Sequence, residues 1–238
     1  MPDTKTTWKD IWDKKSRVNN IVLECLVKAD GFDSVAGSFS VEEWKSYVAE
    51  LYSLIGIKKH HSIFDFGCGS GAFLFNHFLN GGNVGGVDYS SQLIGLAKGF
   101  MGVANFIVGD ASEIKCAGNY DIVTSHSVFQ YFDDLVMAEN VLANMCLMAK
   151  EKIAILDIND ESHAAIYHTE RIAKFKENGL SENDYWDKYR DLEYLFYNKD
   201  FFSDFAIQNN LKIKISPQTN VHYGNSKLRF NVIFGKDC

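Results

Sequence analysis

Residues 62–73 read SIFDFGCGSGAF, and they decide the fold more than any other part of the chain. Residues 63–66 can form a buried strand, the turn that follows contains Gly67, Gly69 and Gly71, and residues 72–75 are expected to open a helix. Such a junction presents backbone N–H groups and the positive end of a helix dipole. Its glycines let a ligand approach the backbone closely. The junction therefore predicts a site for a nucleotide-like cofactor.

The turn alone leaves two classes of cofactor open. Residues 67–72 satisfy the loose dinucleotide pattern G-x-G-x-x-[GA], and they equally satisfy G-x-G-x-G with Asp65 two places before the first glycine. A second predicted strand, residues 83–88, ends in Asp88, about 20 residues after the turn. Both classes use an acid at this place to bind a ribose diol.

The third and fourth predicted strands separate the two classes. Residues 104–111 form a short strand that again ends in an acid, Asp110, and residues 120–125 form a strand that runs into His126. This series of motifs, in this order and at this spacing, resembles the class I S-adenosylmethionine-dependent methyltransferases over roughly residues 60–160. The resemblance implies S-adenosyl-L-methionine as cofactor and S-adenosyl-L-homocysteine as product.

The resemblance also assigns roles to residues of the site. The acid that binds the ribose hydroxyls falls on Asp88, and the acid near the adenine amine falls on Asp110. The expected cofactor-binding residues are Asp65, Gly67, Cys68, Gly69, Gly71, Asp88, Tyr89, Asp110, Ala111 and Ser125. The loop of residues 31–39 is expected to fold over the methionyl end of the cofactor.

Strands and helices alternate from residue 62 to residue 158, which predicts an α/β fold with a doubly wound, mostly parallel sheet in three αβα layers. A capping-box pattern of Ser40 and Glu43 is expected to open a helix that ends near Ile55. In the family that the chain resembles, two terminal strands, here residues 211–215 and 228–234, complete a seven-stranded sheet with the last strand antiparallel.

Three regions are expected along this single structural domain. Residues 1–58 form an N-terminal helical cap, with a helix over residues 8–29 (Ile11, Ile21, Val22 and Leu26 apolar at helical intervals). Residues 59–238 form the methyltransferase core, within which residues 159–208 are a helical insertion on the substrate side, after the fifth strand.

Ligands of open α/β sheets bind outside the carboxyl ends of the strands. The side chains expected to meet the methyl acceptor there are Phe129, Gln130, Tyr131 and Tyr197, although most aromatic residues of the insertion are expected to pack its own core. His126 and His163 are the candidate catalytic bases. No group of residues has the spacing of metal ligands, so no metal is expected.

The amino-acid composition limits the classes of partner that we expect. A formal net charge of −7 without a long Lys/Arg cluster argues against nucleic acid as substrate, because nucleic-acid binding depends on phosphate neutralisation. The cysteines are scattered and lack a C-x-x-C motif, and no segment has the length of a membrane span. We expect a cytoplasmic monomer or homodimer that binds neither nucleic acid nor membrane.

The expected function is methyl transfer to an oxygen or nitrogen of a small polar metabolite, for instance a sugar or a cell-envelope precursor. Two alternatives remain open at this point. One is a non-catalytic protein that binds the cofactor on a methyltransferase fold. The other is an oxidoreductase that uses NAD(P).

Overall fold

The structure is a computed structural model of the chain, and it describes residues 23–32, 39–102, 105–114, 119–190, 192 and 194–236. The helix predicted over residues 8–29 lies outside the described residues except for its end, where α2 spans Leu23–Ala29. The tip of the predicted loop, residues 33–38, also lies outside them.

The described strands form one seven-stranded sheet in the order β3-β2-β1-β4-β5-β7-β6. The strands are β1 (Ile63–Phe66), β2 (Val84–Asp88), β3 (Asn105–Val108), β4 (Tyr120–His126), β5 (Ala149–Asn159), β6 (Lys212–Pro217) and β7 (Arg229–Gly235). Neighbours from β3 to β5 pair in parallel, and β7 pairs antiparallel with both β5 and β6. The predicted fold class, including the antiparallel last strand, is confirmed.

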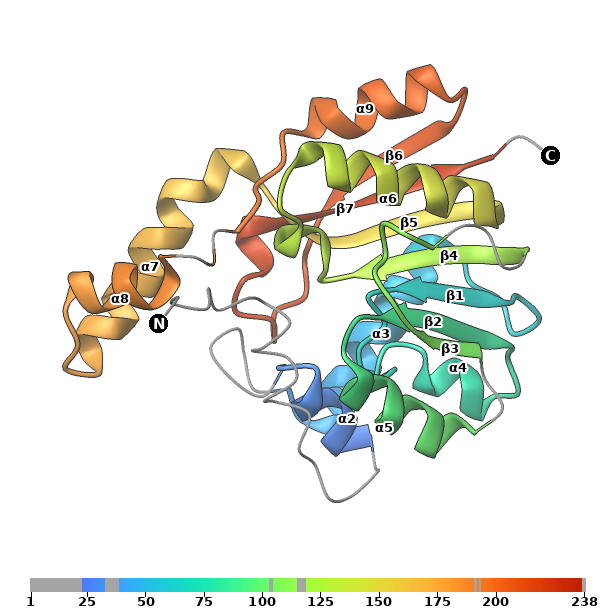
Figure 1. The fold of residues 1–238 in the computed structure, drawn as a ribbon, viewed down its shortest axis with the longest axis horizontal. Coiled ribbons are helices and arrows are strands. Elements are labelled where there is room, and N and C mark those ends of the chain that lie inside the picture. Colours follow the sequence, from blue (N-terminus) through green and yellow to red (C-terminus); the bar gives the residue numbers. More distant parts are fainter. Residues whose placement is uncertain are drawn as a thin grey trace, which may run out of the picture.

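Helices cover both faces of the sheet (Figure 1). On one face lie α2, α3 (Val41–Ile55), α4 (Phe75–Leu79) and α5 (Ser91–Met101), which pack against strand side chains such as Ile63. On the other lie α6 (Leu135–Met148) and α9 (Lys199–Gln208), which pack around Phe64 and Phe66. Because successive strand residues point to opposite faces, β1 is buried on both sides, as a central parallel strand must be.

Two local predictions have clear outcomes. The capping box of Ser40 and Glu43 is present, and α3 ends at Ile55 as expected. The helix expected from Ala72 begins only at Phe75, because residues 71–74 form turns around Gly71, whose φ is +85°.

The described part of the segment expected to be a helical insertion contains three α-helices with different positions. The helices α7 (Ala164–Glu177) and α8 (Glu182–Tyr189) contact each other and extend away from the sheet (Figure 1). The third, α9, instead contacts β6 and belongs to the helical layer on the sheet. The division of the chain at residues 58 and 59 stays a prediction.

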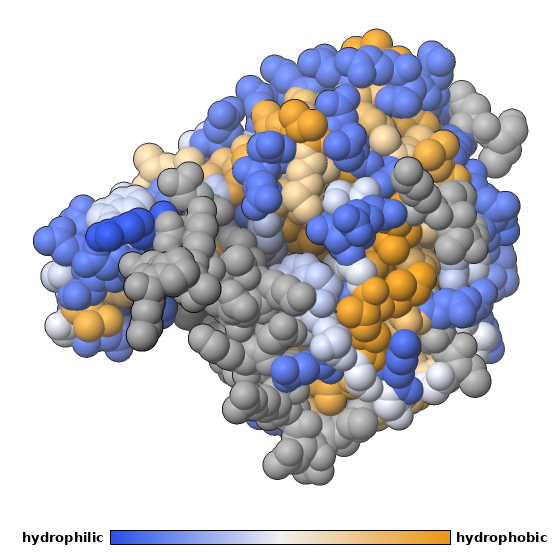
Figure 2. Space-filling model, in the orientation of Figure 1, coloured by the Kyte–Doolittle hydropathy of each residue, from blue (hydrophilic) through white to orange (hydrophobic). Residues whose placement is uncertain are grey.

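The described surface is mixed in character. On the face in Figure 2, hydrophilic side chains cover most of the surface and hydrophobic ones form separate patches between them. Among the described helices, none combines the length and the apolar composition that a membrane crossing demands.

Candidate active site

A cavity of about 180 Å³ lies at the carboxyl ends of the parallel strands. The sheet order places the ends of β3, β2 and β1 on one side of it and those of β5 and β7 on the other, with β4 between them. Because β7 is antiparallel, its first residue, Arg229, pairs with Asn159 near the end of β5 and reaches the same edge of the sheet. The predicted rim is therefore lined from both halves of the sheet.

The structure brings together most of the residues predicted to bind cofactor. Those that line the cavity are Asp65, Gly67, Cys68, Gly69, Asp88, Tyr89, Asp110 and Ala111, and the acceptor-side predictions His126 and Tyr131 line it too. Gly71 and Ser125 do not line it. Gly71 turns the chain toward α4, and the Ser125 hydroxyl donates to the Phe66 carbonyl, joining β4 to β1.

Backbone N–H groups of the glycine turn are already satisfied inside the protein. Those of Gly67 and Cys68 donate to Val87 O, and that of Gly71 donates to Cys68 O. The Gly69 N–H donates to Asp88 Oδ2 at 2.9 Å, and the Ser70 N–H donates to Asp30 Oδ1 at 2.7 Å. A dinucleotide site needs such groups to bind its pyrophosphate. This turn instead presents carboxylates, which suit a donor carrying a sulfonium and an ammonium group.

Gly67 and Gly69 have no room for a side chain. Their φ angles are +75° and +55°, in the left-handed region that favours glycine. A Cβ on Gly67 would lie 2.4 Å from a methyl group of Val128, and one on Gly69 would lie 2.4 Å from Asp30 Oδ1. The close packing of the turn therefore requires glycine at both places.

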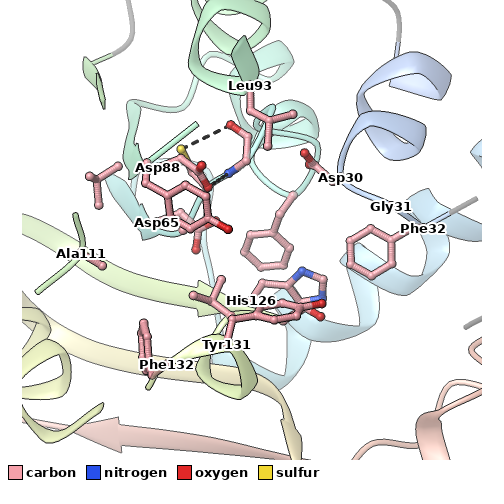
Figure 3. A pocket seen from close by; sticks show the side chains of 18 of the residues that line it. Asp30, Gly31, Phe32, Asp65, Asp88, Leu93, Ala111, His126, Tyr131 and Phe132 are labelled. Carbon is pink, nitrogen blue, oxygen red and sulfur yellow. Dashed lines mark hydrogen bonds between the residues drawn. The ribbon is translucent and has the colours of Figure 1, made fainter. Parts of the chain in front are cut away.

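Asp30 is a lining residue that sequence analysis missed. It follows α2 and points toward the same space as Asp65 and Asp88, with His126 across from them (Figure 3). Burial raises the pKa of Asp30 to about 7, and the nearby Asp88 adds to this. No spacing pattern connects Asp30 to the glycine turn, since α2 precedes the recognisable motifs. Its neighbours Gly31 and Phe32 line the cavity as well.

Asp65 is buried and accepts a hydrogen bond from Thr124 at 2.6 Å. Burial raises its pKa from 3.8 to about 7, against the effect of that hydrogen bond. Between pH 3.8 and about pH 7, the Asp65 carboxyl is protonated in the native state and ionised in the unfolded state. The stability contribution of Asp65 is therefore present at low pH and falls by about 1.4 kcal/mol per pH unit as the pH rises toward 7.

We therefore expect the wild type to lose stability relative to Asp65→Asn between about pH 5 and pH 7. Asparagine keeps an acceptor for Thr124 and has no titrating proton. Denaturant unfolding of both proteins without ligand measures the difference. A difference that is independent of pH would contradict this account of Asp65.

Aromatic rings surround His126 at the end of β4. Its imidazole stacks on Phe73 with a centroid distance of 5.0 Å and on Phe32 at 5.4 Å, and the edge of Trp44 lies nearby. Burial lowers the pKa of His126 to about 4, against the effect of the Asp157 charge, and the Arg229 charge lowers it further. The ring is thus neutral at physiological pH and shielded from water.

A chain of hydrogen bonds assigns the tautomer of His126. The Thr219 N–H donates to Gln218 Oε1, which leaves the Gln218 amide nitrogen to donate to the Tyr47 hydroxyl at 3.0 Å. The Tyr47 hydroxyl lies 2.9 Å from His126 Nε2, and its hydrogen has no other acceptor among the described residues. Tyr47 therefore donates to Nε2, and the imidazole proton lies on Nδ1.

Opposite the acids, the cavity is lined by arginines and tyrosines that were not among the predicted site residues. They are Tyr167, Arg171, Tyr194, Tyr223 and Arg229. Arg229 donates to the Asp157 carbonyl at 3.0 Å, and the Tyr223 hydroxyl donates to Asp157 Oδ2 at 2.8 Å. Asp157 has a φ of +62° at an irregularity in the β5–β7 pairing, a common feature beside active sites.

Four residues predicted for catalysis or acceptor binding do not line the cavity. His163 lies 3.9 Å from Asp160 Oδ2, in the short 3-10 helix Glu161–His163. Phe129 and Tyr197 are buried, and the Tyr197 hydroxyl donates to the Phe129 carbonyl. The Gln130 amide donates to Ser127 Oγ. In this structure the last three support the segment that carries Tyr131.

Comparison with known proteins agrees with this geometry. Residues 57–198 match the model of a family described as a methyltransferase domain. The chain belongs to this family. Its fold is that of the class I S-adenosylmethionine-dependent methyltransferases.

The match to a curated relative covers only part of this chain. A stretch of 96 residues is 31% identical to malonyl-[acyl-carrier protein] O-methyltransferase 1 of Ilyobacter polytropus and covers 38% of this chain and 35% of that protein. The chain thus spans about a third of the length of this curated relative.

Solved structures share the fold of this methyltransferase at low sequence identity. The N-methyltransferase NodS of Bradyrhizobium japonicum, crystallised with S-adenosyl-L-homocysteine, is 12% identical with a TM-score of 0.61, covering 97% of this chain and 98% of that one. Magnesium protoporphyrin IX methyltransferase of Synechocystis, with bound SAM, is 14% identical with a TM-score of 0.59, covering 98% and 93%.

Proposed function

We propose that this methyltransferase transfers a methyl group to an oxygen or nitrogen of a small polar metabolite, bound between His126 and the tyrosines of the cavity. The observation that carries the proposal is a cavity lined by carboxylates at one end and by tyrosines and arginines at the other. A sugar or a cell-envelope precursor, both polar, would suit these groups. The prediction of a sugar or a cell-envelope precursor rests on the sequence.

The acidic end fits S-adenosylmethionine. Asp88, at the end of β2, would accept hydrogen bonds from the ribose hydroxyls, and Asp110, which follows β3, would accept one from the adenine amine. Asp88 already accepts from Gly69 and Ser90, but a carboxylate offers further lone pairs. When bound, the cofactor supplies a methyl group activated by the positive charge of its sulfur. The sequence-based idea that loop 31–39 covers the methionyl end is supported by Gly31 and Phe32, which line the cavity.

His126 acts in this proposal as a hydrogen-bond donor that positions the acceptor. Its Nε2 is occupied by Tyr47, and Nδ1 carries a proton without a hydrogen-bond partner among the described residues. We expect this alignment of the acceptor with the methyl group to matter more than proton transfer, because aligning reactants lowers the barrier by up to about 7–11 kcal/mol. The aromatic rings of Phe32 and Phe73 exclude water from the imidazole.

The tautomer of His126 can be measured without knowing the acceptor. Nitrogen-15 NMR of the histidine rings is expected to show the His126 proton on Nδ1 in the wild type, and Tyr47→Phe is expected to release this preference. In turnover, His126→Gln should lower kcat/KM without removing an acidic limb near pH 4, where burial places the pKa of His126. A proton on Nε2, or the loss of such a limb, would identify His126 as a base instead.

A transfer assay tests the proposed function itself. Radiolabelled methyl transfer from S-adenosylmethionine is measured against nucleotide-linked sugars, amines and carboxylic acids. Transfer to at least one small acceptor is expected. Tight binding of S-adenosyl-L-homocysteine without any transfer across this panel would favour a non-catalytic binding protein.

A further inference from the structure

The two ends of the cavity differ in charge. The described carboxylates of the lining are those of Asp30, Asp65, Asp88 and Asp110, which lie directly after α2 or in and just after β1, β2 and β3. The two lining arginines come from α7 and from the start of β7, at the other side of β4. The chain carries a net charge of −7, so this positive region runs against the charge of the molecule.

Among the described residues, the two arginines of the arginine end are in contact with one carboxylate, that of Asp157. Arg229 lies 3.5 Å from Asp157 Oδ2, and both side chains are buried. Among the described residues no carboxylate pairs with Arg171, whose Nη atoms donate instead to the hydroxyls of Tyr167 and Tyr189. The Nε atoms of both arginines are buried without a hydrogen-bond partner in the described part of the chain.

The two guanidinium groups also lie close to the same ring. The Cζ atoms of Arg171 and Arg229 are 5.3 Å and 5.9 Å from the centroid of the Tyr167 ring. Both positive charges thus lie near one ring, and among the described residues one carboxylate, that of Asp157, is in contact with them. Guanidinium groups bind carboxylate and phosphate well, since their fork of donors matches these planar or tetrahedral anions.

We infer that the methyl acceptor carries an anionic group, a carboxylate or a phosphate, which Arg171 binds at the arginine end of the cavity. This inference rests on the proposed function and names the class of its substrate. The acidic end holds the cationic donor and the arginine end holds the anionic acceptor, so the charges of the cavity orient the two substrates. The Tyr167 hydroxyl, which accepts from Arg171, keeps its own hydrogen to donate to the anion.

Calorimetry on the protein saturated with S-adenosyl-L-homocysteine tests this inference, with inorganic phosphate and malonate as separate probes. We expect saturable binding of at least one probe to the wild type, weakened at least about tenfold in Arg171→Gln, since hydrogen bonds to charged groups contribute that much. The probe that binds more tightly tells phosphate from carboxylate. Binding of neither probe, or equal binding to Arg171→Gln, would overturn the inference.

Two further variants distinguish loss of the Arg171 charge from loss of the local structure around Arg171. Arg190→Gln makes the same change at an exposed arginine of the α8 end, outside the cavity, and should leave probe binding unchanged. Tyr189→Phe removes a hydroxyl that joins Arg171 to α8 and keeps the charge, so anion binding should persist. If Tyr189→Phe abolishes binding as fully as Arg171→Gln, Arg171 has only a structural role. Failure of S-adenosyl-L-homocysteine itself to bind would count against the proposed function instead.

Discussion

Replacing Asp88 with alanine is expected to weaken the binding of S-adenosyl-L-homocysteine by about 1–3 kcal/mol, the value of a charged hydrogen-bond acceptor. Asp88 has two tasks in this structure. Its side chain holds the Gly69 and Ser90 N–H groups, and it faces the cavity where the ribose is expected. The variant loses the ribose contact and leaves a buried N–H of the turn without its acceptor. Isothermal titration of both proteins measures the change in Kd.

Asp204→Ala is the matched control for this prediction. Asp204 is exposed on α9 and does not line the cavity, so its removal should leave the Kd unchanged. Unfolding of the Asp88 variant should be followed in parallel, so that a loss of folded protein is not mistaken for a loss of affinity. An unchanged Kd in a folded Asp88→Ala protein would mean that the ribose lies elsewhere.

The second large effect is expected in stability, from Trp44→Ala. Trp44 is fully buried, and its indole N–H donates to the Ala72 carbonyl at 3.2 Å, which joins α3 to the segment after the glycine turn. Its ring also lies 4.7 Å from that of Phe32. Truncation of a buried aromatic side chain costs about 3–5 kcal/mol. Cofactor affinity should fall as well, because Trp44 and Phe32 both line the cavity.

Denaturant unfolding with Trp186→Ala as the control tests this prediction. Trp186 is 45% exposed on α8, so the same truncation there should cost much less. Trp44→Phe keeps a ring and loses the hydrogen bond to Ala72, and an intermediate loss is expected. If the two alanine variants lost equal stability, α3 would not be anchored through Trp44.

The donor end of the site could be predicted from sequence because its chemistry is local. Each of Asp65, Asp88 and Asp110 lies in or directly after a short apolar strand, and parallel strands bring such ends to one edge. The glycine turn could be recognised for the same reason. The mostly parallel sheet followed from the alternation of elements, and its antiparallel last strand followed from the resemblance.

The acceptor end could not be predicted in this way, because its residues come together only through tertiary structure. Arg229 begins an antiparallel strand far from the motifs, and Arg171 lies on a helix whose sequence pattern does not reveal which face meets the cavity. The position of His163 close after β5 led to its prediction as a catalytic base. In the structure its ring instead lies near Asp160. Tyr197 belongs to an aromatic cluster with Phe129 and Phe202 instead of facing the cavity.

Titration of the wild-type protein with S-adenosyl-L-homocysteine and, separately, with NADH tests the central claim most directly. The turn N–H groups already donate to carboxylates and carbonyls of the protein, so the cavity should bind S-adenosyl-L-homocysteine at one site per chain and should not bind NADH. Binding of NADH without binding of S-adenosyl-L-homocysteine would contradict the account.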